Sequence, residues 1–415
     1  MRNIATEFEA LYYKTDHCVR CGRCTIVCPT YNATKKETML ARGRIRLVRE
    51  YVEENLSLSS RLKLYNDLCL GCNACLEVCP ARIQVGELVG LMKEEIVKHD
   101  GLAFTDSVLL KRGLNKPQSF RMLLTLFNTN KRLGLMKLLP KELKDKAELL
   151  PDIPRQSFRA QYVDGGYAPK EKKYRVGYFV GCMTNGIYPQ VADAVVKVLA
   201  YHDCEVIIPQ GTVCCGLPHH AYGDKEASAK LARTNIELFQ QADVDYIVTD
   251  CASCCHALKN YAKYTALSED LSEQAKEFAG KVYDINQLLV DEAGLRVGTK
   301  ALPQAAVTYH DSCHLNRNLN VTSQPREILK AIPGLEFKEM PEADWCCGAA
   351  GSFSIKYQDV SQKILERKTE NIASTEAAYA SAGCPACMMQ LDYGSRHFAK
   401  SYQVKHPIQF LAETI

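Results

Sequence analysis

Two twelve-residue stretches decide the fold of the N-terminal part of this chain: CVRCGRCTIVCP at residues 18–29 and CLGCNACLEVCP at residues 69–80. Both follow the spacing C-x2-C-x2-C-x3-C-P without change. In a chain of 415 residues without an export signal, cysteines at such short and fixed intervals are typical of metal ligands rather than of disulfides. The repeated pattern therefore predicts metal centres within residues 1–99.

The spacing also indicates how the ligands are shared. Three thiolates at two-residue intervals can surround one [4Fe–4S] cluster, while the x3 turn carries the fourth cysteine away, and in two-cluster ferredoxins that cysteine ligates the other cluster. The predicted sets are Cys18, Cys21, Cys24 and Cys79 for one cluster, and Cys69, Cys72, Cys75 and Cys28 for the other. The alternative is a zinc site built from C-x2-C pairs, which two copies of the full pattern disfavour.

Residues 174–415 contain a second duplication. Each copy has one cysteine after a strand-like stretch, then a vicinal Cys-Cys-Gly and a C-x2-C pair. The members are Cys182, Cys214, Cys215, Cys251 and Cys254 in the first copy, and Cys313, Cys346, Cys347, Cys384 and Cys387 in the second. Matching positions are offset by 131, 132 and 133 residues, so a whole domain is duplicated. A tetrahedral zinc site or a metal-free redox dithiol remains an alternative for each set.

Strand-like and helix-like stretches alternate in both copies. Strands are expected at 175–180, 205–208, 246–249, 306–309 and 335–340, and helices at 191–200, 227–241, 325–332 and 360–373. This alternation predicts an α/β domain with a parallel sheet in each copy, and ligands at the carboxyl ends of its strands.

The expected fold is thus α+β and multidomain. An α-rich two-cluster module at 1–99 is followed by a cysteine-free helical connector at 100–173, rich in Leu, Lys and Pro, and by two α/β repeats at 174–300 and 301–415.

Composition excludes several classes of function. A net charge of +4 is too small for a nucleic-acid-binding surface. The sequence contains no run of 18 apolar residues uninterrupted by a charged residue, so no transmembrane helix is expected. The mixed charge of the first ten residues argues against a secretory signal, which favours the cytoplasm, with peripheral association at the inner face of the membrane left open. Without a G-x-G-x-x-G fingerprint or a P-loop, the chain is not expected to bind its own flavin or nicotinamide.

The vicinal cysteines carry a family resemblance. With their spaced partners they resemble the CCG cysteine-rich domain found in heterodisulfide reductase and in the glycolate oxidase iron–sulfur subunit. The motif order, with the paired ferredoxin motif first and two CCG repeats after it, resembles the glycolate oxidase subunit and related lactate-utilisation proteins. The supporting stretches are YHDSCHL at 309–315, PREIL at 325–329, CCGAAG at 346–351 and GCPAC at 383–387. The resemblance covers nearly the whole chain except the connector.

The resemblance implies that the five cysteines of the second copy bind an iron–sulfur cluster, which in the heterodisulfide reductase relatives is a noncubane [4Fe–4S] cluster. Glycolate oxidase subunits commonly have a degraded first repeat, whereas this chain keeps all five cysteines there. One or two such clusters are therefore expected besides the two in the ferredoxin module. His310 and His314 flank Cys313 and are candidates either for a proton or hydrogen bond to a substrate, or for a structural role at the end of a strand.

The function that the resemblance implies is electron transfer within a flavin-dependent 2-hydroxyacid oxidoreductase acting on glycolate or lactate. A separate FAD-binding subunit would oxidise the acid, and this chain would pass the electrons to a quinone, an electron-transfer flavoprotein or another carrier. The alternative is a heterodisulfide or disulfide reductase-like subunit that reduces its substrate at a CCG-bound cluster. No catalytic residue is assigned in either case.

Overall fold

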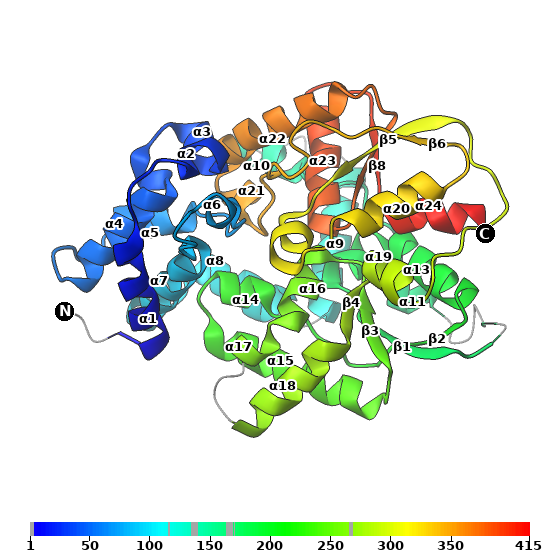
Figure 1. Ribbon diagram of the computed structural model, residues 1–415, viewed down its shortest axis with the longest axis horizontal. Helices are drawn as coiled ribbons and strands as arrows, with labels where there is room; N and C mark the ends of the chain where they lie inside the picture. Colours follow the sequence, from blue (N-terminus) through cyan, green and yellow to red (C-terminus); the bar gives the residue numbers. More distant parts are fainter. Residues whose placement is uncertain (1–3, 115–116, 134–139, 163–168, 170, 265–268) are drawn as a thin grey trace.

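The computed structural model describes residues 4–114, 117–133, 140–162, 169, 171–264 and 269–415 (Figure 1). The N-terminal module lies at one end of the molecule, and the two sheet-containing repeats lie beside each other at the other end. Residues 134–139 and 163–168 of the expected connector are outside the described residues.

The described part of the N-terminal module, residues 4–100, consists of short helices and loops. The elements are α1 (Thr6–Lys14), η1 (Thr15–His17), α2 (Cys24–Val27), α3 (Pro29–Thr34), η2 (Glu37–Met39), α4 (Ala41–Val52), α5 (Ser60–Asp67), α6 (Ala74–Glu77) and α7 (Val85–Asp100). Helix α4 forms because Ile45, Val48 and Val52 repeat at helical spacing, and all three are buried in a core shared with α1 and α7. This core holds the two cysteine-bearing loops in place.

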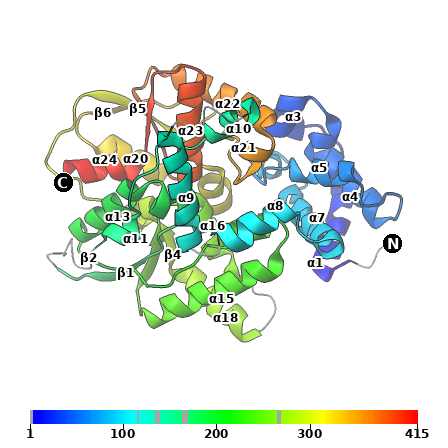
Figure 2. The same cartoon turned by 180° about the vertical axis from the view of Figure 1, so that it is seen from behind.

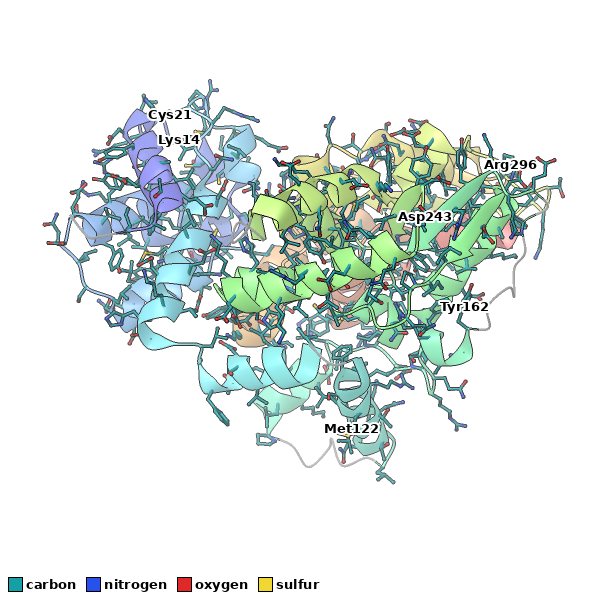
Figure 3. The ribbon with its side chains drawn as sticks, turned by 90° about the horizontal axis from the view of Figure 1, so that it is seen from below. Lys14, Cys21, Met122, Tyr162, Asp243 and Arg296 are labelled. Carbon is teal, nitrogen blue, oxygen red and sulfur yellow. The ribbon has the colours of Figure 1, made fainter. Side chains whose placement is uncertain are left out.

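The connector is helical and packs against the first repeat. Its elements are α8 (Phe104–Ser107), the π-helical turn η3 (Val108–Leu114), α9 (Pro117–Arg132), α10 (Lys141–Ala147) and α11 (Phe158–Gln161). From behind, α8 extends from the module toward the repeats, and α9 lies over the repeats (Figure 2). Leu124 of α9 is buried against Gly186, whereas Met122 is 64% exposed and points away from the body (Figure 3).

The two repeats have the same sheet topology, which confirms the predicted parallel sheets. The strand order is β2-β1-β3-β4 in the first sheet and β6-β5-β7-β8 in the second, with every neighbouring pair parallel. The strands are β1 (Tyr174–Tyr178), β2 (Cys204–Ile207), β3 (Tyr246–Thr249), β4 (Val282–Asp284), β5 (Ala305–His310), β6 (Leu335–Phe337), β7 (Tyr379–Ala382) and β8 (Gln403–Lys405). Strands β4, β7 and β8 were not predicted, and they are short, with three or four residues each.

Helices cover both sheets and join the repeats. In the first repeat they are α12 (Cys182–Gly186), α13 (Pro189–Tyr201), α14 (Leu217–Ala221), α15 (Lys225–Gln241), α16 (Ala252–Lys259), α17 (Tyr261–Tyr264), α18 (Glu269–Lys281), α19 (Ile285–Gln287) and η5 (Leu288–Glu292). In the second they are η6 (His314–Asn318), α20 (Ser323–Ala331), α21 (Phe353–Lys356), α22 (Gln358–Ala373), α23 (Pro385–His397) and α24 (Pro407–Thr414). The Lys197 ammonium on α13 donates to the Ala412 carbonyl on α24 at 2.8 Å. The four predicted helices correspond to α13, α15, α20 and α22.

The N-terminal module docks on the second repeat through an apolar cluster. Met39 and Leu68 of the module pack with Cys346, Phe353 and Ile364 of the repeat, and all five are buried. Burial of this surface stabilises the joint through the hydrophobic effect. The contact also brings a cysteine-bearing loop of the module next to the vicinal cysteines of the second repeat.

Candidate metal centres

The eight cysteines of the N-terminal module line two adjacent pockets. One pocket is bordered by Cys18, Cys21, Cys24 and Cys79, the other by Cys28, Cys69 and Cys72, and Cys75 borders both. The structure thus brings the fourth cysteine of each stretch to the first three of the other stretch. Apolar residues such as Ile45 and Val85 complete the lining.

The donor spacing fits a multi-iron cluster better than a single ion. Sulfur atoms around a tetrahedral zinc ion lie about 3.8 Å apart, since each Zn–S bond is about 2.3 Å long. Among the described residues, the one set of three His, Cys, Asp or Glu ligand atoms lying within 4.8 Å of one another is His310, Cys347 and Cys387, in the second repeat. The module's cysteines instead surround hollows, as ligands of a larger group do.

Binding of iron would also offset the electrostatic cost of holding thiolates in a buried site. Burial raises the pKa of the Cys72 thiol to about 11, and the nearby Arg317 guanidinium lowers it only in part. Burial also raises the pKa of the Cys75 thiol well above its usual value. Because metals bind thiolates, binding of iron would displace these protons and give the buried sulfurs a cationic partner.

The two pockets differ in their access to solvent. Cys21 is exposed and lies at an edge of the module, far from Arg296 on the first repeat (Figure 3). Val19 and Ile26 beside it are each 72% exposed. Cys28, by contrast, is buried, and Cys72 of the second pocket faces the second repeat. One pocket is therefore open to a partner, and the other faces inward.

Arg317 of η6 joins the inward pocket to the second repeat. Its side chain is 4% exposed, and its guanidinium donates to the Cys72 carbonyl at 3.4 Å and to the Glu77 carboxylate at 3.0 Å. The same group donates to the carbonyl and the carboxylate of Asp344, each at 2.7 Å. The Asn73 side chain donates to that of Asn318 at 2.8 Å next to this joint. Sequence analysis did not identify Arg317, which follows Cys313 by one helical turn.

The five predicted cysteines of each repeat come together at the carboxyl ends of the strands. Cys251 and Cys384 immediately precede α16 and α23, and the vicinal pairs lie in the loops after β2 and β6. Thiol hydrogen bonds link Cys182 to Cys214, Cys214 to Cys215, Cys215 to Cys254 and Cys254 to Cys251. In the second repeat they link Cys346 to Cys347, Cys347 to Cys387 and Cys387 to Cys384.

The two cysteine sets also touch each other, which sequence spacing could not indicate. A hydrogen bond from the Cys251 thiol lowers the pKa of Cys384 across the boundary between the repeats. The Ala252 amide donates to the Gly383 carbonyl at 3.0 Å beside this contact. The Ser253 hydroxyl oxygen lies 3.6 Å from the Cys384 sulfur and 3.1 Å from Nδ1 of His314. The loops after β3 and β7 therefore form one junction.

Cys313 connects the second set to the N-terminal module. Burial raises the pKa of the Cys313 thiol, and the negative potential of Cys72 raises it further. The pKa of Cys346 is also raised, mainly by the hydrogen bond to Cys347 and by burial, and to a smaller extent by the negative potential of Cys72. The described cysteine sets thus follow one another from the exposed Cys21 to Cys182 in the first repeat.

The glycines after the vicinal cysteines have a structural role. Gly216 and Gly348 adopt φ values of +83° and +82°, which L-residues rarely adopt. A Cβ on Gly348 would lie 2.9 Å from the Ser361 carbonyl oxygen, and one on Gly216 would lie 3.1 Å from the Ser228 hydroxyl. The approach of α15 or α22 therefore requires glycine at each position.

Two buried positions make the repeats chemically different. His310 at the end of β5 corresponds to Phe179 after β1, and Lys368 on α22 corresponds to Asn235 on α15. Burial lowers the pKa of Lys368 to about 8, and its ammonium donates to the Glu342 and Ala343 carbonyls just before the vicinal cysteines. The second repeat therefore has a buried imidazole and a buried ammonium group where the first has a phenyl ring and an amide.

Comparison with known proteins agrees with this architecture. A model of the 4Fe-4S dicluster domain matches residues 14–83, and a model of the cysteine-rich CCG domain matches residues 176–259 and 307–392. The chain is 30% identical to the probable glycolate oxidase iron-sulfur subunit of Bacillus subtilis over 98% of this chain and 95% of that protein. The chain belongs to the glycolate oxidase iron–sulfur subunit family. Its dicluster and CCG domains are those of iron–sulfur proteins.

Other members of this wider family match all or part of the chain. An uncharacterised iron-sulfur protein of Methanococcus maripaludis is 30% identical over 94% of this chain and 70% of its own length. Lactate utilization protein A of Shouchella clausii is 34% identical over 57% of this chain and 98% of its own length. No helix among the described residues is long and apolar enough to cross a membrane.

Proposed function

We propose that this chain is the electron-transfer subunit of a flavin-dependent 2-hydroxyacid oxidoreductase that acts on glycolate or lactate. A separate FAD-binding subunit would remove the electrons from the acid, and a quinone, an electron-transfer flavoprotein or another carrier would receive them. The near full-length similarity to the Bacillus subtilis protein supports this proposal, since that protein carries the name of an oxidase subunit. Delivery to a quinone would bring the chain to the inner face of the membrane.

The observation that carries the proposal is the continuity of the cysteine sets. They extend from the exposed Cys21, past Cys72 at the module joint, to the Cys251–Cys384 contact between the repeats. When bound, iron–sulfur clusters supply one-electron transfer. The chain's own residues would hold these centres in a fixed order, exclude water from the inner ones and leave one end open to a partner.

The proposed ligands are the predicted cysteines. Two [4Fe–4S] clusters would be held by Cys18, Cys21, Cys24 and Cys79, and by Cys69, Cys72, Cys75 and Cys28. A third centre would be held by Cys313, Cys346, Cys347, Cys384 and Cys387, and a fourth by Cys182, Cys214, Cys215, Cys251 and Cys254. The first repeat supports a fourth centre because its vicinal pair and its C-x2-C pair are linked in the same order as those of the second repeat.

The complete cysteine set of the first repeat favours a second candidate, a disulfide reductase that uses a CCG centre as its active site. Burial argues against it. Eight of the ten CCG cysteines are buried, and only Cys182 and Cys313 retain intermediate exposure. A substrate disulfide would have to reach a sulfur or iron atom beneath the covering helices, whereas electrons can cross a closed interior.

Anaerobic purification of the native complex distinguishes the two functions. We expect an FAD-binding chain to co-purify, and glycolate or lactate to drive reduction of an artificial dye. Isolation of the chain with thiol-reductase-type partners, together with disulfide-dependent oxidation of a reduced dye, would contradict the proposal and favour the reductase.

A further inference from the structure

His310 is a buried histidine whose ring has no nitrogen or oxygen partner. It is the last residue of β5, its side chain is 1% exposed, and neither ring nitrogen is hydrogen-bonded to a nitrogen or oxygen atom among the described residues. The Cys347 thiol hydrogen-bonds the imidazole, which leaves the other ring nitrogen unsatisfied. A buried polar group in this state costs free energy, so a native structure keeps one where a bound group satisfies it. The surroundings of the ring indicate which group that is.

Two thiols face the imidazole. A ring nitrogen of His310 and the sulfurs of Cys347 and Cys387 all lie within 4.8 Å of one another, and all three residues are buried. Imidazole nitrogen and thiolate sulfur are the donors that iron and zinc share in proteins. Donors on one tetrahedral metal ion lie about 3.5–3.8 Å apart, so only a small closure would bring these three onto a common ion.

The first repeat shows that the fold does not need a histidine at this position. Its counterpart is Phe179, which lies 131 residues earlier and is also buried, with its ring 6.2 Å from that of Phe239. A hydrocarbon ring therefore fits the same place at the end of the equivalent strand. The imidazole is specific to the repeat whose thiols surround it, which argues for a role in binding rather than in packing.

We propose that His310 is a nitrogen ligand of iron in the centre of the second repeat, next to Cys347 and Cys387. This inference rests on the proposal that the cysteines of this repeat hold an iron–sulfur centre. A neutral imidazole donates less negative charge than a thiolate, and nitrogen ligation raises the reduction potential of iron–sulfur centres. The centre of the second repeat would therefore accept electrons more readily than that of the first.

His314 provides a matched control. It adjoins Cys313 in the same motif, but its ring already has partners, a hydrogen bond to Ser253 at 3.1 Å and a stacking contact with His256 at 4.8 Å. His314→Gln should therefore leave the nitrogen ligation unchanged. His310→Phe introduces the residue that the first repeat uses, so the strand and its core are expected to tolerate it.

The test is pulsed EPR of the full chain, reconstituted anaerobically and prepared with natural-abundance or 15N-labelled histidine. We expect a strong nitrogen hyperfine coupling that changes with the isotope, persists in His314→Gln and disappears in His310→Phe. The reduction potential of the corresponding signal should be lower in His310→Cys. Circular dichroism and the signals of the N-terminal module report whether each variant is folded.

Three outcomes would overturn the inference: no nitrogen coupling in the loaded wild type, a coupling only as weak as an N–H···S hydrogen bond gives, or a strong coupling that survives in His310→Phe. Failure of the underlying proposal has a different signature. In that case Cys346→Ser would change neither the iron content nor any EPR signal, which would show that the second repeat binds no iron.

Discussion

Replacement of Arg317 by glutamine is expected to loosen the joint between the N-terminal module and the second repeat. The guanidinium is almost fully buried and makes four hydrogen bonds, two to the carbonyls of Cys72 and Asp344 and two to the carboxylates of Glu77 and Asp344. Glutamine is shorter and uncharged, and it can replace at most one or two of these bonds.

The magnitude follows from the environment of each bond. The 2.7 Å bond to the Asp344 carbonyl is charge-assisted and partly buried, so its loss costs about 2 kcal/mol, and the loss of the 3.4 Å bond to Cys72 costs about 1 kcal/mol. The carboxylates of Asp344 and Glu77 are 50% and 42% exposed, so solvent screening limits their combined contribution to about 1 kcal/mol. The expected loss of unfolding free energy is about 2–4 kcal/mol.

The substitution also removes a positive charge next to Cys72. Arg317 lowers the pKa of this thiol against the larger effect of burial, and it would stabilise the reduced, more negative form of a cluster there in the same way. The two carboxylates partly neutralise the guanidinium. The remaining interaction between the guanidinium and the cluster is about 1 kcal/mol at an effective dielectric constant near 20. For one electron this corresponds to a reduction potential lower by about 40 mV.

Denaturant unfolding and EPR-monitored redox titration measure the two effects. Arg326→Gln is the control, since this arginine is also largely buried but pairs with Asp311 and Glu339 within the second repeat. It should destabilise the protein without shifting the potential of the module's inner cluster. An unchanged stability and potential in Arg317→Gln, or an equal shift of potential in Arg326→Gln, would refute this account of the joint.

Three further predictions concern the cysteine sites and the glycines. Cys72→Ala should abolish the EPR signal of one module cluster and spare the other, and unchanged iron content and spectra would show that the ligand assignment is wrong. Gly348→Ala should lower the unfolding free energy by about 1–3 kcal/mol, because alanine is strained at φ +82° and meets the Ser361 carbonyl. Gly280→Ala on α18 meets no atom within 4 Å and should be neutral or stabilising by up to about 1 kcal/mol, so equal effects of the two substitutions in denaturant unfolding would contradict the argument. Cys254→Ser should lower the iron content while both module signals remain, whereas a full iron content would mean that the first repeat holds no centre.

Much of this architecture could be predicted from the sequence because its signals are local. The cysteine spacings need only a few neighbouring residues, and strands such as β1 and β3 each end in three consecutive buried residues. The duplication was visible because its offset is nearly constant. Strands β4 and β8 were missed; each has three residues and is defined by its pairing with β3 or β7.

The contacts between the modules could not be predicted in this way. The hydrogen bond from Arg317 joins residues 245 positions apart, and the Cys251–Cys384 contact depends on how two complete domains pack. His310 was noticed beside Cys313, but its neighbours are the thiols of Cys347 and Cys387, which other loops supply. Sequence spacing predicts the cysteines of each site, whereas tertiary packing decides which sites adjoin.

The most direct test of electron transfer by this chain is to add glycolate or lactate anaerobically to the complex with its FAD-binding partner and to follow the iron–sulfur EPR signals over time. The account predicts that the flavin is reduced first and that signals of reduced iron–sulfur centres in this chain then appear, with none when the partner is omitted. Centres that stay oxidised beside a reduced flavin, or dithionite-reduced centres that a disulfide substrate reoxidises directly, would contradict it.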